Sequence, residues 1–264
     1  MPGGAIIELE GVGRSFDGGR SPAVDGVSLR IEPGELLALV GASGSGKTTT
    51  LKMINRLVEP DRGRVLIEGA PADGLPAPEL RRRIGYVFQG IGLFPHLSVA
   101  ENIGVTPSLL GWAKPEIEAR TLELLDLVGL PRAYAGRAPD ALSGGERQRV
   151  GVARALAARP KIVLMDEPFG ALDPVTRDEI GHAYRELHDR LGLTTVMVTH
   201  DMQEAILLAD RIAVMRKGRL AADGAPGELL SASADPEVRA LMDMPRRQAE
   251  RVRTRLGEDG AAHG

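Results

Sequence analysis

One glycine-rich stretch constrains this chain more than any other, and its sequence is Gly41-Ala42-Ser43-Gly44-Ser45-Gly46-Lys47-Thr48. It follows the apolar run Leu36 to Val40 and opens a helix-compatible segment, Lys47 to Leu57. Glycines give a loop backbone angles that are closed to other residues, so its N–H groups can point at an anion in front of a helix N-terminus. A strand, this loop and a helix in that order predict a phosphate-binding site rather than a flexible Gly/Ser turn.

The loop also predicts roles for its polar side chains. We expect Lys47 to reach the β- and γ-phosphates of a nucleotide, Thr48 to place its hydroxyl on Mg²⁺, and Thr49 to face the α-phosphate. The residues expected to hold the nucleotide here are Gly41, Ser43, Gly44, Gly46, Lys47, Thr48 and Thr49.

A second stretch, Leu142-Ser143-Gly144-Gly145-Glu146, could also bind a phosphate, although it carries no lysine. Ser143 and Glu146 have the spacing of a capping box ahead of a helical segment over 147–158, and Ser98 with Glu101 has the same spacing. Ser143 and the N–H groups of Gly144 and Gly145 would then form an anion nest at a helix start.

Two acidic residues follow a buried strand. The apolar run Ile162 to Met165 ends in Asp166-Glu167, which would bring both carboxylates to the carboxyl end of a parallel sheet, where ligands collect. Asp166 suits a contact to Mg²⁺, directly or through water, and Glu167 is then free to take a proton from a water that attacks the γ-phosphate. The alternative is an acidic pair that only begins a loop.

The distribution of apolar runs predicts an α/β fold. Strands are expected at 6–9, 27–31, 36–40, 64–68, 84–88, 162–165, 194–199 and 212–215, and a helical pattern covers 175–191. Nearly continuous apolar strands separated by helices indicate a parallel sheet that is covered on both faces. Between 98 and about 159 strand patterns give way to helical periodicity, which predicts an inserted helical subdomain.

Composition limits the classes of protein. The chain of 264 residues has no cysteine, which excludes disulfides and thiol catalysis and fits a reducing compartment. Its net charge of −3 argues against a nucleic-acid partner, although arginines make the segment 246–264 basic; we interpret it as a solvated helix end or flexible tail. Neither an export signal nor a membrane span is apparent, so we expect a soluble protein that is not exported.

The order of these motifs resembles the nucleotide-binding subunit of an ABC transporter over nearly the whole chain. The signature Leu-Ser-Gly-Gly at 142–145 is specific to that family. A P-loop kinase, the alternative class of nucleotide-binding enzyme, would give no reason for this segment. The resemblance implies a RecA-like P-loop core with an N-terminal antiparallel β portion, one ATPase domain over 1–245, and ATP and Mg²⁺ as cofactors. It also implies a homodimer or a paired subunit, in which ATP lies between the phosphate loop of one copy and the signature of the other.

The resemblance assigns further site residues. Phe16 matches the aromatic that stacks on the adenine, with a core phenylalanine as the alternative, and Val24 is expected to contact the nucleotide as well. Gln89 matches the glutamine that touches Mg²⁺ and the attacking water, and His200 the histidine that contacts the γ-phosphate and orients the catalytic glutamate. Asp173 matches the aspartate that couples the two sites of the dimer. The remaining histidines are expected to be surface or packing residues, namely His96, His182, His188 and His263.

Three segments, 53–63, 90–96 and 107–112, resemble the ATPases of osmoprotectant importers, which take up quaternary ammonium solutes such as glycine betaine, choline or carnitine. Two features depart from that pattern: Gly90 stands where a second polar residue is usual, and the chain after Leu220 is too short for the paired regulatory domains of many members. We therefore do not expect their form of ionic-strength sensing.

The resemblance implies partners and a place in the cell. Membrane-spanning permease subunits would contact the region Gln89 to Leu97, a substrate-binding protein would complete the complex, and the chain would lie in the cytoplasm on the inner face of the cell membrane. The main alternative is an importer of another small solute, such as an amino acid, nitrate or a polyamine. A non-transport ABC ATPase in DNA repair or on ribosomes is a further alternative, but such proteins usually need coiled-coil insertions or a second cassette.

Overall fold

A six-stranded sheet forms the centre of the computed structural model, which describes residues 4–17, 21–90, 92–232 and 235–256. Its strand order is β10-β9-β3-β8-β7-β6, with every neighbouring pair parallel except β10 and β9. The strands are β3 (Leu36–Val40), β6 (Ile84–Val87), β7 (Ile162–Asp166), β8 (Thr194–Val198), β9 (Arg211–Arg216) and β10 (Arg219–Gly224). The parallel sheet predicted from the apolar runs is therefore confirmed.

The N-terminal part forms a second, antiparallel sheet with the strand order β2-β1-β4-β5. Its strands are β1 (Ile7–Ser15), β2 (Pro22–Ile31), β4 (Arg62–Ile67) and β5 (Ala70–Pro71). Ile7 lies opposite both Ile31 and Ile67, so apolar side chains from three strands share one face. The predicted N-terminal antiparallel portion is confirmed.

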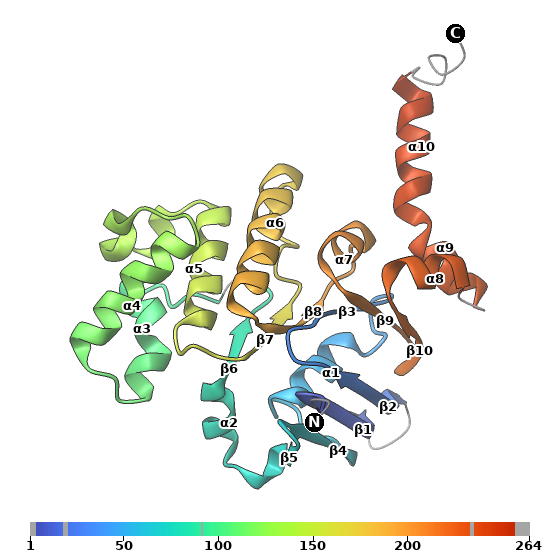
Figure 1. Cartoon of the computed structure of the whole chain (residues 1–264), viewed down its shortest axis with the longest axis horizontal. Helices are drawn as coiled ribbons and strands as arrows, with labels where there is room; N and C mark the ends of the chain where they lie inside the picture. Colours follow the sequence, from blue (N-terminus) through green and yellow to red (C-terminus); the bar gives the residue numbers. More distant parts are fainter. Residues whose placement is uncertain (1–3, 18–20, 91, 233–234, 257–264) are drawn as a thin grey trace.

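Helix α1 (Lys47–Ile54) lies between the two sheets (Figure 1). Leu51, Met53 and Ile54 are fully buried in a core cluster that also contains residues of β1, β2, β3 and β8. The helix ends before the predicted Leu57, because Arg56 has a φ of 56° and the Leu57 N–H turns back to the Lys52 carbonyl.

The other face of the six-stranded sheet packs against helices. A second core cluster joins Leu36, Ala38 and Val40 of β3 to residues of α5, α6 and α7, while Leu37 and Leu39 face α1. The helices are α5 (Gly144–Leu156), α6 (Pro174–Leu191) and α7 (Met202–Leu208). Alternation along β3 thus buries both faces of the sheet, as the continuous apolar runs predicted.

Residues between β6 and β7 form a helical group at one side of the sheet (Figure 1). It contains α3 (Val99–Leu109), α4 (Lys114–Leu127), the 3₁₀ turns η2 (Arg132–Gly136) and η3 (Pro139–Ala141), and α5. Both predicted capping boxes are present, with Ser98 and Glu101 at the start of α3 and Ser143 and Glu146 at the start of α5. The helical character predicted for 98–159 is confirmed.

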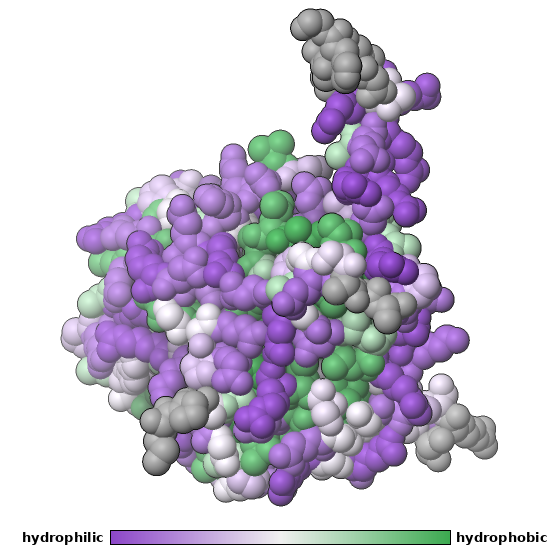
Figure 2. All heavy atoms as spheres, turned by 45° about the vertical axis from the view of Figure 1, so that its right-hand side comes forward, coloured by the Kyte–Doolittle hydropathy of each residue, from purple (hydrophilic) through white to green (hydrophobic). Residues whose placement is uncertain are grey.

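The remaining elements lie at the periphery: η1 (Ala72–Gly74), α2 (Ala77–Arg83), α8 (Pro226–Ala232), α9 (Pro236–Met242) and α10 (Met244–Leu256). Helix α10 has no buried residue and projects from the body with a largely hydrophilic surface (Figure 2). The basic segment begins in this helix; residues 257–264 of it, including His263, lie outside the described residues, as do Gly18, Gly19 and Ile91.

Candidate nucleotide site

The phosphate loop runs from the end of β3 to the start of α1, and its shape requires glycine at two positions. Gly41 has a φ of 143°, and a Cβ atom there would lie 2.2 Å from the Met215 carbonyl oxygen. Gly46 has a φ of 102°, and a Cβ atom there would lie 2.4 Å from the Ala23 carbonyl oxygen. Gly46 caps α1 without a side-chain hydrogen bond, which leaves the first N–H groups of the helix open toward an anion.

Lys47 lies over the loop that precedes it. Its Nζ donates hydrogen bonds to the carbonyl oxygens of Gly41 at 2.8 Å and Ala42 at 3.0 Å. Burial lowers the pKa of the Lys47 ammonium, and the carboxylates of Glu167 and Asp166 act in the opposite direction. The lysine therefore lies between the loop and the two acids at the end of β7.

Thr48 and Asp166 are brought together from separate elements. The Thr48 hydroxyl donates to Asp166 Oδ1 at 2.8 Å, and Lys52 Nζ lies 4.0 Å from Asp166 Oδ2. A hydroxyl beside a buried carboxylate at the foot of a phosphate loop supplies the hard oxygen ligands that Mg²⁺ prefers, so the residues fit this ion. Lys52 carries no motif that predicts a site role, although its position one helical turn after Thr48 places it on the same face of α1.

Glu167 is the meeting point of three elements. Its carboxylate Oε2 accepts a hydrogen bond from Gln89 Nε2 at 3.0 Å and lies 3.4 Å from His200 Nδ1. Glu167 itself has a φ of 46°, an uncommon conformation for a residue other than glycine, and its N–H donates to the Val198 carbonyl oxygen at 2.9 Å. A carboxylate held by an amide and an imidazole in this way can accept a proton from a water molecule.

Phe16 and Val24, which are both predicted to contact the nucleotide, differ in their exposure to solvent. Phe16 follows β1 and is 63% exposed, with the Arg14 guanidinium 5.1 Å from the centre of its ring. The alternative of a core phenylalanine is therefore wrong. Val24 is fully buried beside the phosphate loop, with its Cγ2 3.3 Å from the position of a Cβ atom at Gly46.

The signature residues lie at the start of α5 and pack against the same chain's α6. The Glu146 N–H donates to Ser143 Oγ at 3.3 Å, and the Ser143 N–H donates to Glu146 Oε2 at 2.7 Å, which lowers the pKa of the Glu146 carboxyl. A Cβ atom at Gly145 would lie 2.7 Å from Thr176 Cγ2. Asp173 caps α6 by accepting the Thr176 N–H at 3.0 Å.

The structure thus brings one group of predicted residues together and leaves another apart. The loop 41–48 lies with Asp166 and Glu167, and Glu167 contacts Gln89 and His200. Among the described residues no hydrogen bond joins Ser143, Gly144 or Gly145 to that group. Within one copy of the chain, the described hydrogen bonds therefore do not connect the two predicted phosphate-binding segments.

The other histidines have ordinary environments. His188 is buried, and its ring contacts Thr195 Oγ1 at 3.0 Å and the Gly34 carbonyl oxygen at 3.2 Å. His182 is exposed and lies 3.4 Å from Glu186. His96 packs edge-on near Phe94. The prediction of surface or packing roles is confirmed for these three residues.

Comparison with known proteins gives a consistent result. Residues 24–170 match the family model of the ABC transporter. The chain is 47% identical over 241 residues to the choline transport ATP-binding protein OpuBA of Bacillus subtilis, a match that covers 91% of this chain and 63% of that relative. It is 49% identical over 234 residues to the glycine betaine uptake system ATP-binding protein YehX of Escherichia coli, covering 89% of this chain and 75% of that relative.

A solved structure supports the same relationship. The dimeric structure of a bacterial ABC transporter cassette matches with a TM-score of 0.75 at 35% identity, covering 83% of this chain and 98% of that one. The predicted P-loop ABC ATPase fold is thereby confirmed. None of the helices in the described part of the chain is long and apolar enough to cross a membrane.

Proposed function

The chain belongs to the ABC transporter family, and on that premise we propose that it binds and hydrolyses ATP to drive uptake of an osmoprotectant such as glycine betaine, choline or carnitine. The observation that carries the proposal is the convergence of Gln89 and His200 on Glu167, beside the Thr48 and Asp166 pair. A site that only binds nucleotide does not need a carboxylate held between an amide and an imidazole.

In this proposal the phosphate loop and Lys47 bind the β- and γ-phosphates, while Phe16 stacks on the adenine above Val24. Thr48, Asp166 and Gln89 would hold Mg²⁺, which would neutralise charge on the phosphate oxygens. Glu167 accepts the proton of the attacking water, and the amide of Gln89 orients that water.

His200 has two tasks in the same step. It contacts the γ-phosphate, and its Nδ1, 3.4 Å from Glu167 Oε2, holds the carboxylate toward the water. The backbone of Glu167 is fixed independently by its N–H bond to Val198, so the side chain is positioned from two directions. Such preorganisation lowers the cost of reaching the transition state.

We further propose that two copies act together. The separation of Ser143, Gly144 and Gly145 from the phosphate loop leaves each loop without a second cage for the γ-phosphate. A head-to-tail dimer provides it, with the signature of one copy facing the loop of the other and Asp173 of each copy at the contact. The dimeric structure of the similar cassette supports a dimer of this chain.

A groove beside Gln89 suits the permease. A space of about 540 Å³ is lined by residues of α2, β6, α3 and α5, and Leu57, Phe88 and Phe94 at its rim are 43–44% exposed. Arginines 81 and 82 add positive charge to the same groove. An apolar cytoplasmic helix of a permease with an acidic end would match it, and its contact would reach Gln89 directly. The chain would then lie on the inner face of the membrane, with a substrate-binding protein completing the complex.

The two curated relatives named above carry choline and glycine betaine in their names, which supports a quaternary ammonium solute. The chain spans 63% of the length of the choline relative. An importer of an amino acid, nitrate or a polyamine is the competing proposal, because the solute binds other subunits.

Transport by the whole complex tests the proposal. Cells that lack their own osmoprotectant importers would express the chain with its membrane and binding subunits, and uptake of labelled glycine betaine, choline and carnitine would be measured. We expect uptake with the wild-type chain and none with Glu167→Gln. Uptake restricted to a labelled amino acid, nitrate or polyamine would contradict the proposed solute class but would leave the proposed ATP hydrolysis unaffected.

A further inference from the structure

Arg177 on α6 contacts two loops of the candidate site at once. Its Nη1 lies 2.9 Å from Asp201 Oδ2, and its Nη2 donates to the Leu172 carbonyl oxygen at 3.2 Å. Leu172 directly precedes Asp173, and Asp201 directly follows His200. One guanidinium therefore joins the loop expected at the dimer contact to the loop that carries the histidine.

The loop that carries His200 is also held by hydrogen bonds to α7. Asp201 Oδ1 accepts the N–H groups of Gln203 at 2.9 Å and Glu204 at 3.2 Å, which leaves Oδ2 for Arg177. The Asp201 N–H donates to Thr199 Oγ1 at 3.0 Å, and the Thr199 hydroxyl donates to the Glu204 carboxylate. The turn around His200 is thus anchored to α7, and Arg177 is its link to α6.

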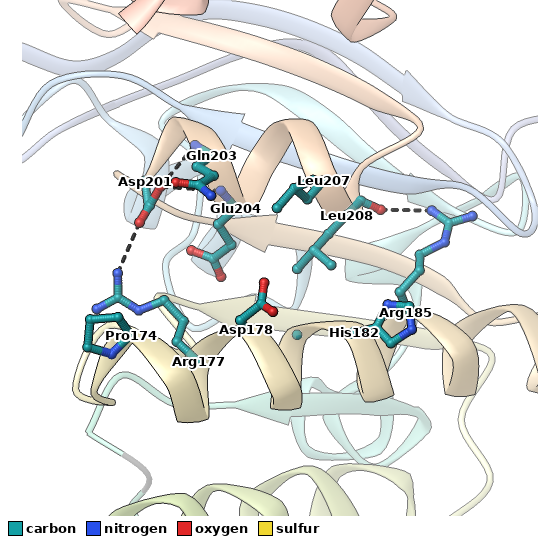
Figure 3. A pocket seen from close by; sticks show the side chains of 11 residues that line it. Pro174, Arg177, Asp178, His182, Arg185, Asp201, Gln203, Glu204, Leu207 and Leu208 are labelled. Atoms are coloured by element: carbon teal, nitrogen blue, oxygen red, sulfur yellow. Dashed lines mark hydrogen bonds and ion pairs between the residues drawn. The ribbon is translucent and has the colours of Figure 1, made fainter. Parts of the chain in front are cut away.

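Arg177 and Asp201 lie at one end of a cavity of about 300 Å³ between α6 and α7, as Figure 3 shows. Arg185, two turns further along α6, lies at the other end and donates to the Leu208 carbonyl oxygen at 2.8 Å. The two arginines therefore lie on the same helix and line the same cavity, and each contacts one backbone carbonyl and at least one carboxylate. Of these two arginines, Arg177 is the one that contacts the loops of the nucleotide site.

The loop held by Arg177 also lies against the catalytic group. A Cβ atom at Gly170 would lie 3.8 Å from both Glu167 Oε2 and His200 Cε1, and the Gly170 N–H donates to the Glu167 carbonyl oxygen at 3.3 Å. A shift of the segment 170–173 therefore acts directly on Glu167 and on the His200 ring, and it acts on the backbone of the His200 loop through Arg177.

We propose that Arg177 is a positioning residue that transmits the arrangement of the Asp173 loop to His200, so that the state of one nucleotide site of the dimer governs hydrolysis in the other. The inference rests on the proposed dimeric ATPase. The planar guanidinium suits the task because two of its nitrogens hold a carboxylate and a carbonyl in a fixed relative position, which a single ammonium does not do. The side chains of Arg177 and Asp201 are 28% and 30% exposed, so this ion pair adds little to stability and its loss leaves the fold intact.

Arg177→Gln tests the inference, with Arg185→Gln as the matched control. Hydrolysis of MgATP would be measured against ATP concentration for both variants and the wild type, together with nucleotide affinity and the melting temperature. We expect cooperative hydrolysis in the wild type and the control. Arg177→Gln should keep its nucleotide affinity and lose cooperativity. Its turnover should fall by up to about 10²-fold, the cost that a misplacement of about 1 Å in a reacting group can have.

A second variant separates positioning from a general structural role. Asp201→Asn should reproduce the loss of cooperativity, and the double variant Arg177→Gln/Asp201→Asn should lose no more than either single change. Retained cooperativity in Arg177→Gln, equal losses in both arginine variants, or non-cooperative hydrolysis by the wild type would each overturn the inference. A wild-type chain that does not hydrolyse MgATP would instead overturn the proposed function.

Discussion

Gln89 and Glu167 are joined by a hydrogen bond of 3.0 Å between Nε2 and Oε2, although 78 positions separate them in the sequence. The bond connects the loop after β6 to the end of β7, two strands that pair in parallel. Because Phe88 at the rim of the groove is the neighbour of Gln89, a partner that moves this loop also changes the hydrogen bond to the carboxylate.

Glu167→Gln should bind MgATP and hydrolyse it about 10²- to 10⁴-fold more slowly, because the amide cannot accept the proton of the attacking water. Loss of the carboxylate charge near the γ-phosphate should also stabilise an ATP-bound dimer. Steady-state phosphate release and size-exclusion chromatography with ATP would measure the two effects. Hydrolysis within a few-fold of wild type would remove Glu167 from the role of general base.

Lys47→Ala should weaken nucleotide binding before it affects chemistry. The substitution removes a full positive charge from the loop, and the N-terminus of α1 supplies only about half a charge. Calorimetric titration with ATP measures the affinity, and Lys161→Ala, which changes an exposed lysine paired with Glu68, is the control. Equal affinities for the two variants would show that the loop is not the nucleotide site.

A mixture of Lys47→Ala and Ser143→Arg chains should recover activity that neither variant has alone. In a head-to-tail dimer the mixture forms one intact composite site and one site with both defects, whereas each homodimer has two damaged sites. The arginine adds bulk and charge at the start of α5 and blocks the facing loop. MgATP-dependent dimerisation and hydrolysis would be measured in the mixture.

Recovery could not occur if each chain built its site from its own residues. Cross-linked heterodimers without any recovery would count against the head-to-tail arrangement, or show that one site does not work without the other. Titration of ATP bound per dimer distinguishes these two results, since a working composite site holds one nucleotide even when hydrolysis needs both.

Glu204 should make the stability of the fold depend on pH. Burial raises the pKa of its carboxyl from 4.5 to about 7, so between these values the folded chain holds a proton that the unfolded chain releases. The free energy of unfolding therefore falls as pH rises from 4.5 to about 7 and levels off above it. The loss is on the order of 3 kcal/mol, since each pKa unit corresponds to about 1.4 kcal/mol.

Glu204→Gln should lack this dependence, because its amide does not titrate. Its melting temperature relative to wild type should rise steadily between pH 4.5 and 7, while the same replacement at the exposed Glu116 should follow wild type. Parallel melting curves of wild type and Glu204→Gln across this range would contradict the buried, protonated carboxyl.

The parts of the fold that sequence predicted are those with a strong local signal. β3 has five consecutive buried apolar residues, and its predicted bounds are those observed. The capping boxes at Ser98 and Ser143 need only the spacing of two side chains. In contrast, β10 was not predicted, because Arg219–Gly224 contains neither a continuous apolar run nor a clear alternation of apolar and polar residues. It forms a strand through its antiparallel pairing with β9.

The residues of the candidate site also divide into those with a local sequence signal and those without one. Thr48 and Asp166 were predicted from motifs, and folding places them 2.8 Å apart. Gln89 carries no local pattern, and only the family resemblance selected it. Arg177 was not selected at all, because its importance depends on two loops that meet only in three dimensions.

The position of α1 between the two sheets has a mechanical consequence. A nucleotide that grips the loop before this helix also fastens the antiparallel layer to the parallel layer, since Leu51, Met53 and Ile54 belong to the core between them. Bound ATP should therefore slow hydrogen exchange in β1 and β2 as well as around the phosphates. A ligand that binds at the start of α1 is therefore expected to stabilise the packing of the N-terminal sheet against the six-stranded sheet.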